Sequence, residues 1–352
     1  MSLPPSSSAG IGSRTPPPRH CSAPAPSRSL TGSSEPTRSL ATFQLPVVDM
    51  AKLLDPELSA LETAKLGSAC REWGFFQLVN HGVDEAVMQQ MKDSVAQFFS
   101  SPLQTKNAVA VREGGIQGFG HHFSGASGDK LDWAECLLLF TQPLQDRNMD
   151  FWPPTNPSTF RDALDKYSVE ISNLTRRLLA FMAIDLGISQ EALLGAFFFG
   201  DGRRRRQGAE RVNAPLPSVV GMTPHTDSMA LTLLLHADGT PAGLQIKRGG
   251  RWFPVPPLPG AVIVNVGDAL DVLTNAAYAS VKHRVVPDVE RDRVTVAMFH
   301  EASVQGQVTP LPELLLAGGQ APRYRSTGMQ EFRNGTVRAM AQGTRFLDSL
   351  KI

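Results

Sequence analysis

Two histidines and an aspartate restrict the fold of this chain more than any other feature of its sequence. His225 and Asp227 are separated by one residue, and His283 lies far downstream. Alternate residues of an extended strand point to the same side, so His225 and Asp227 can bind one ion without distorting the backbone. Two imidazoles and one carboxylate that leave coordination positions open suit non-haem Fe(II). His283 must then arrive from a distant strand.

The sequence between these residues supplies strands for that return. It contains an apolar run at 231–235, a hairpin-like stretch at 243–255 and a second apolar run at 261–266. A sheet that folds back on itself would bring His283 to the other two ligands. Taken alone, the pair His225 and Asp227 is a short motif that occurs by chance, and a single histidine is more often a surface or core residue.

A strand predicted at 293–299 strengthens the metal interpretation. Strict alternation divides this strand into two faces. One face carries Arg293, Thr295, Ala297 and Phe299, and the other carries Val294, Val296 and Met298. A guanidinium binds a carboxylate through two hydrogen bonds, and burying it without such a partner costs much free energy. An Arg293 side chain that points inward beside the Thr295 hydroxyl therefore predicts a site for a small dicarboxylate. The alternative is an ordinary arginine on an edge strand.

Several motifs together resemble one family, the plant-type 2-oxoglutarate- and Fe(II)-dependent dioxygenases. The motifs are His225-Thr-Asp-Ser-Met-Ala-Leu-Thr-Leu-Leu-Leu, Gly243-Leu-Gln-Ile, Val264-Asn-Val-Gly-Asp268, Ser280-Val-Lys-His-Arg-Val285 and Arg293-Val-Thr295. Phe43-Gln-Leu-Pro-Val-Val-Asp49 and Trp73-Gly-Phe-Phe-Gln-Leu-Val-Asn-His-Gly-Val83 are similar to the N-terminal region of the same proteins. The resemblance covers about 43–352, and Thr295 stands where the family usually has serine.

The resemblance implies a fold, a reaction and a set of site residues. The fold is mixed α and β, with a distorted double-stranded β-helix (jelly roll) core, flanking helices and a helical N-terminal region. His225, Asp227 and His283 would bind Fe(II), while Arg293 and Thr295 would bind 2-oxoglutarate. The reaction would be hydroxylation, desaturation or demethylation of a plant specialised or hormone-like metabolite by O2, with release of succinate and CO2 and with ascorbate as reductant.

The same resemblance nominates residues that would contact the organic substrate. Cys136 and Leu138 lie on one face of a strand predicted at 131–140, which lines the substrate pocket in the family. Phe299 and Glu301 follow the strand that would bind 2-oxoglutarate and face the mouth of the barrel if alternation continues. The alternative for the 131–140 strand is simple packing in the core.

Composition excludes several other classes of protein. The chain has 352 residues, 41% of them hydrophobic, which is ample for a globular core. A formal net charge of +1 argues against a nucleic-acid partner, and the absence of a long apolar run argues against a membrane span. Three scattered cysteines form neither a disulfide framework nor a metal motif, which favours a reducing compartment such as the cytoplasm. We expect a monomer with a small-molecule substrate.

The sequence divides into five segments. Residues 1–42 are rich in Ser, Pro and Arg and cannot form a core, so they are a disordered tail or a plastid or mitochondrial transit peptide. Residues 43–150 are the N-terminal dioxygenase region, and residues 151–210 contain a long bracing helix and an arginine-rich loop. Residues 211–305 form the jelly-roll core that would hold Fe(II) and 2-oxoglutarate, and residues 306–352 form a helical tail. An apolar stripe of helical spacing predicts that the long helix spans 158–186.

Three further stretches carry weaker signals. The glycine-rich stretch 107–130 predicts a loop, and the adjacent His121 and His122 diverge too much to share a metal. Four arginines, Arg203 to Arg206, are interpreted as a solvated loop rather than a phosphate-binding patch. The sequence after Arg211 lacks the Tyr of the Asn-x-Tyr motif usual in the family, which leaves a catalytically silent binding protein open. An iron oxidase that does not use 2-oxoglutarate is the other alternative.

Overall fold

The computed structural model describes residues 44–121, 133–142, 144, 147–153, 157–198, 205–212, 221–288 and 290–352. Its larger sheet has eight strands in the order β1-β2-β10-β7-β12-β5-β4-β3. All neighbours are antiparallel except β1 and β2, which are parallel. The strands are β1 (Val47–Asp49), β2 (Phe75–Val79), β3 (Gly118–Gly120), β4 (Ala134–Gln142), β5 (Arg205–Val212), β7 (Leu231–His236), β10 (Val262–Val266) and β12 (Arg293–His300).

A smaller sheet faces one side of the larger one. Its order is β6-β11-β8-β9, formed by β6 (Met222–His225), β11 (His283–Val285), β8 (Leu244–Arg248) and β9 (Arg251–Pro254). Two clusters of buried side chains join the sheets. In one, Ala134 and Cys136 of β4 pack with Met222 of β6 and Val285 of β11. The other includes Phe75 and Ile263 from the large sheet and Leu244 and Ile246 from the small one. Two sheets packed in this way form the predicted jelly-roll core.

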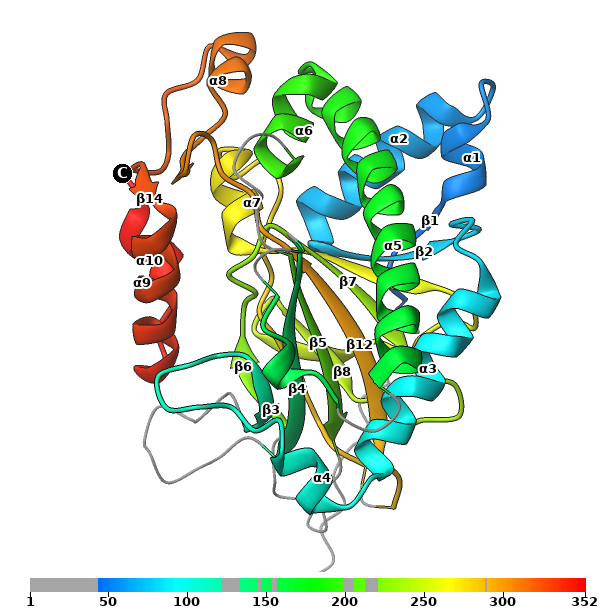
Figure 1. Ribbon diagram of the computed structural model, residues 1–352. Coiled ribbons are helices and arrows are strands. Elements are labelled where there is room, and N and C mark those ends of the chain that lie inside the picture. The colour runs from blue at the N-terminus through cyan, green and yellow to red at the C-terminus, as the bar shows by residue number, and fades with distance from the viewer. Residues whose placement is uncertain are drawn as a thin grey trace, which may run out of the picture. The chain divides into compact units, whose positions relative to one another are not determined.

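Helices cover the opposite side of the large sheet. Figure 1 shows α5 (Pro157–Leu186) running along it, next to α3 (Glu85–Ser100). The α5 stripe is fully buried at Leu174 and Leu178, and Phe181 packs against the same cluster while partly buried. The long helix predicted at 158–186 corresponds to α5, and its buried face packs in one cluster with residues of the sheet.

Shorter helices complete the chain. They are α1 (Met50–Leu54), α2 (Ser59–Ser68), the π-helix η1 (Ala69–Trp73), α4 (Leu103–Asn107), the 3-10 helix η3 (Met149–Phe151), α6 (Gln190–Phe198), α7 (Asp268–Leu273), α8 (Pro312–Gly318), α9 (Met329–Ala341) and α10 (Phe346–Leu350). Strands β13 (Gln307–Val308) and β14 (Thr327–Gly328) pair with each other before α9. The predicted helical tail at the C-terminus thus corresponds to α8, α9 and α10. No helix in the described ranges combines the length and the hydropathy needed to cross a membrane.

The two faces of β12 differ as its sequence predicts. Val294, Val296 and Met298 belong to the core under the helices. Because successive side chains of a strand point to opposite faces, Arg293 and Thr295 lie on the face that the small sheet covers. A charged side chain is therefore placed inside the barrel.

Two predictions of irregular structure are wrong in part. Arg205 and Arg206 open strand β5, which pairs along its whole length with β12 on one side and with β4 on the other. Backbone pairing with these two long strands extends this part of the arginine run; Arg203 and Arg204 lie outside the described residues. Within the stretch predicted as a loop, Gly118–Gly120 forms β3, which pairs with β4.

Candidate metal centre

His225, Asp227 and His283 meet at one end of the small sheet. His225 ends β6, His283 begins β11, and these two residues are direct partners in the antiparallel ladder. Asp227 Oδ1 lies 3.7 Å from His225 Nε2 and 3.5 Å from His283 Nε2. One ligand atom from each residue lies within 4.8 Å of the other two, a separation that a single ion can bridge. The structure therefore brings together the three residues that the sequence nominates.

Backbone carbonyls orient both imidazoles. Nδ1 of His225 lies 2.7 Å from the carbonyl oxygen of Thr223, and Nδ1 of His283 lies 3.2 Å from that of Val281. A carbonyl oxygen only accepts, so each Nδ1 carries a hydrogen, and in the neutral form of each ring Nε2 keeps a lone pair. Both lone-pair nitrogens are the atoms nearest to Asp227. This arrangement is the usual way in which a protein fixes the tautomer of a metal-binding histidine.

Two neutral side chains orient Asp227. Its Oδ2 accepts hydrogen bonds from Thr232 Oγ1 at 2.6 Å and from Asn265 Nδ2 at 2.8 Å. These bonds occupy one carboxylate oxygen and turn Oδ1 toward the histidines. Neither Thr232 nor Asn265 is among the site residues predicted from the sequence motifs. A signal was present, because Asn265 is the only polar residue of the apolar and fully buried strand Val262–Val266.

The protonation states also suit a cation. Burial, followed by the positive charge that His283 can carry, lowers the pKa of His225 to about 4. Burial alone would raise the pKa of Asp227, but the opposing effects of His283, His225 and the Asn265 hydrogen bond bring this pKa well below its usual range. At neutral pH His225 is neutral and Asp227 is an anion, which are the forms that bind a metal.

Arg293 and Thr295 form a polar region inside the barrel. They are 2% and 1% exposed, respectively, and Thr295 Oγ1 has no hydrogen-bond partner among the described residues. A Cβ atom at Gly243 would lie 2.5 Å from the carbonyl oxygen of Val286 and 3.1 Å from Arg293 Cδ, so a side chain there would clash with the Val286 backbone and crowd the arginine stem. The pKa of His236 is lowered, first by burial and also by the charge of Arg293. A guanidinium and a hydroxyl buried on one face can hold a carboxylate.

The four candidate substrate residues differ in their surroundings. Leu138 and Phe299 are partly exposed, and Cys136 is buried between the sheets in the cluster with Met222 and Val285. Glu301 is buried and forms an ion pair with Arg333 of α9, using both carboxylate oxygens. Leu138 and Phe299 thus keep some exposed apolar surface, while the charge of Glu301 is already compensated.

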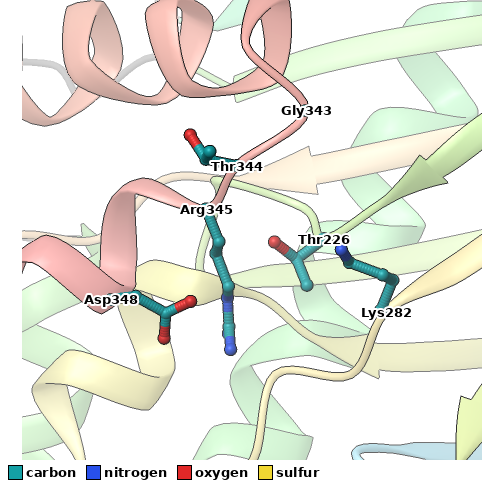
Figure 2. A pocket seen from close by; sticks show the side chains of 6 residues that line it. All are labelled: Thr226, Lys282, Gly343, Thr344, Arg345 and Asp348. Carbon is teal, nitrogen blue, oxygen red and sulfur yellow. The ribbon is translucent and has the colours of Figure 1, made fainter. Parts of the chain in front are cut away.

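A cavity lies beside the segments that carry His225 and His283. It has a volume of about 560 Å³ and is lined by residues of those segments and of the C-terminal region, namely Thr226, Lys282, Gly343, Thr344, Arg345 and Asp348 (Figure 2). An adjoining cavity includes His225 together with Thr336 and Met340 of α9. The C-terminal helices therefore form one wall of the approach to this end of the small sheet.

Comparison with known proteins agrees with this geometry. Residues 45–155 match the family described as non-haem dioxygenase in morphine synthesis N-terminal, and residues 210–302 match the 2OG-Fe(II) oxygenase superfamily. The chain belongs to this superfamily and is a 2-oxoglutarate-dependent dioxygenase, as its sequence motifs predict.

Relatives and solved structures cover most of the chain. It is 35% identical to S-norcoclaurine synthase 1 of Coptis japonica, over 88% of this chain and 87% of the relative, and 33% identical to codeine O-demethylase of Papaver somniferum, over 88% and 85%. The crystal structure of JOX2 in complex with 2OG, Fe and JA superposes with a TM-score of 0.77 at 28% identity, covering 88% of this chain and 90% of that one. The jelly-roll fold predicted from the sequence is therefore confirmed, as is the membership of a family that uses Fe(II) and 2-oxoglutarate.

The orientation of Asp227 can be tested through Thr232. Thr232→Val keeps the shape of the side chain but removes one of the two hydrogen bonds that fix the carboxylate. Loss of a group that orients a metal ligand typically weakens metal binding about 10- to 100-fold. We expect at least a tenfold rise in the Kd for Fe(II) in anaerobic titrations. Thr175→Val, which removes a buried hydroxyl of α5, should leave this Kd unchanged; an equal change in both variants would contradict the assignment.

Proposed function

We propose that His225, Asp227 and His283 hold the Fe(II) of this dioxygenase and that Arg293 and Thr295 bind the distal carboxylate of 2-oxoglutarate. The observation that carries the proposal is the convergence of two lone-pair Nε2 atoms and one carboxylate oxygen at a single point. The buried Thr295 hydroxyl without a partner in the described region supports the second part.

The donor set fits the metal and the cosubstrate. Two neutral imidazoles and one carboxylate on one side of an ion leave positions for 2-oxoglutarate and O2. When both are bound, they supply the oxidising chemistry, in which 2-oxoglutarate, O2 and a substrate R–H give succinate, CO2 and R–OH. The chain's own residues orient the ligands: Thr232 and Asn265 hold Asp227, the carbonyls of Thr223 and Val281 hold the imidazoles, and the barrel wall around Arg293 excludes water.

We further propose that the substrate is a small plant specialised or hormone-like metabolite with an apolar or aromatic body. Leu138 and Phe299 offer apolar surface, and the Glu301–Arg333 ion pair leaves no net charge at its position. Relatives named for their substrates include codeine O-demethylase of Papaver somniferum and oxoglutarate-dependent flavonoid 7-O-demethylase 1 of Ocimum basilicum. The expectations of ascorbate as reductant, a monomer, a cytoplasmic location and no nucleic-acid partner stay predictions.

Succinate release tests the function directly. The full chain with Fe(II), ascorbate, O2 and 2-oxoglutarate should form succinate when incubated with members of a panel of flavonoids, alkaloids and carboxylic hormones, in equal amounts to the oxidised product. If no panel member stimulates succinate formation and the amount of 2-oxoglutarate stays unchanged, the result would favour a silent binding protein. Substrate oxidation without any consumption of 2-oxoglutarate would favour an iron oxidase.

Arg293 provides a specific test of cosubstrate binding. Removal of one partner of a buried, hydrogen-bonded charge pair costs roughly 2 to 5 kcal/mol, and each factor of ten in affinity corresponds to about 1.4 kcal/mol. Arg293→Leu should therefore raise the Kd for 2-oxoglutarate at least about tenfold, while the Kd for Fe(II) stays near that of the wild type. Arg293→Lys should lie between them, because it keeps the charge and loses the fork. If the Leu variant binds 2-oxoglutarate as tightly as the wild type, Arg293 has a structural role in the strand and does not bind the cosubstrate.

A further inference from the structure

A buried carboxylate next to the metal centre connects three separate parts of the chain. Asp268 is 1% exposed and is the first residue of α7. Its two oxygens accept hydrogen bonds from a residue of the His225–Asp227 segment, from a residue just before His283 and from the C-terminal region. None of these three bonds reaches the side chain of a proposed metal ligand, so the Asp268 carboxylate acts on the segments that carry the ligands rather than on the ligand atoms.

The first connection holds the segment that carries His225 and Asp227. Thr226 Oγ1 donates to Asp268 Oδ2 at 3.0 Å, and the backbone N–H of Asp268 donates to the carbonyl of Asp227 at 2.7 Å. The approach is close, since a Cβ atom at Gly267 would lie 2.0 Å from the carbonyl oxygen of Met229. Asp268 therefore fixes the backbone on both sides of the Asp227 side chain.

The second connection holds the segment that carries His283. Ser280 Oγ donates to Asp268 Oδ1 at 2.7 Å, and the backbone N–H of Ser280 donates to Asp271 Oδ2 at 2.9 Å. Ser280 lies three residues before His283, at the entry to β11. One turn of α7 thus anchors the two segments that must stay in register for the three ligands to meet.

The third connection comes from the C-terminus. Arg345, between α9 and α10, donates to Asp268 Oδ1 from Nη2 at 2.6 Å and from Nε at 3.1 Å, and to the carbonyl of Ser280 at 3.2 Å. Figure 2 shows the Arg345 side chain extending from the C-terminal segment into the space beside Thr226. A second carboxylate, Asp271, lies 3.7 Å from Arg345. Arg345 therefore neutralises a pair of buried acids that otherwise have only neutral hydrogen-bond donors among the described residues.

We propose that Asp268 and Arg345 are positioning residues through which the C-terminal segment sets the affinity for the metal. The proposal rests on the assignment of His225, Asp227 and His283 as the ligands. A buried carboxylate that loses its cation is strongly destabilised and reorganises toward water. Such a movement of Asp268 releases Thr226 and Ser280 together, and with them the relative position of the two ligand-bearing segments. The segment between α9 and α10 thereby contributes to metal affinity, although it supplies no ligand.

The test compares metal affinity with stability in the full-length protein. Arg345→Leu and Asp268→Asn should each raise the Kd for Fe(II) by about tenfold, as measured by anaerobic titration of the metal-free protein. This is the lower end of the loss of metal affinity that follows removal of a group that orients a metal ligand. The matched control is Arg147→Leu, which removes another largely buried arginine, one whose partner Asp165 lies on α5. Arg147→Leu should lower the unfolding temperature of the metal-free protein and leave the Kd for Fe(II) as in the wild type.

Two further variants separate positioning from a general loss of structure. Arg345→Lys keeps the charge and loses one of the paired hydrogen bonds, so its Kd should fall between those of the wild type and Arg345→Leu. The double variant Asp268→Asn/Arg345→Leu should bind Fe(II) no more weakly than Asp268→Asn alone, because both changes act through one carboxylate. The proposal is overturned if Arg345→Leu and Arg147→Leu weaken Fe(II) binding equally, or if Arg345→Leu leaves it unchanged. If the wild-type protein binds no Fe(II), the ligand assignment itself fails.

Discussion

The burial of the Asp227 carboxylate is the constraint on which the geometry of this site depends. A buried anion is stable only when its oxygens are hydrogen-bonded and its charge is matched. One oxygen of Asp227 is bound by Thr232 and Asn265, from two neighbouring strands of the large sheet. The other faces two imidazoles from the small sheet, and a divalent cation there would supply the missing positive charge. The site therefore requires both sheets, and its geometry is fixed by their register.

The large sheet separates structural and chemical roles by its two faces. On the helix side, α5 and α3 pack against β-branched and other apolar residues, and this layer contains most of the buried hydrophobic side chains. On the barrel side, the same strands carry polar groups such as Thr232, Asn265, Arg293 and Thr295, all of which are buried. Because the helices supply the hydrophobic stabilisation, the barrel interior can tolerate polar residues that a simple core would exclude.

Local periodicity explains which features could be predicted from the sequence. The spacing of His225 and Asp227, the alternation along β12 and the stripe of α5 each depend on residues close together in the chain, and the structure shows all three. The position of Asn265 in an apolar strand was a signal, but neither its partner Asp227 nor the Arg345–Asp268 pair could be predicted, because these partners are distant in sequence and only the folded chain brings them together. Strand β5 was misjudged for the same reason, since its arginines are extended by pairing with β4 and β12 rather than by their own preference.

The most direct test of this account is the amount of Fe(II) that the protein retains after anaerobic loading and dialysis. The wild type should retain about one ion per chain, and His225→Ala, Asp227→Ala and His283→Ala should each retain almost none, because two remaining ligands no longer define the facial site. Circular dichroism should show that all three variants keep the jelly-roll fold, since the apolar layers do not depend on the ligands. Retention of iron at the wild-type level by any one folded variant would contradict the assignment of that residue as a ligand.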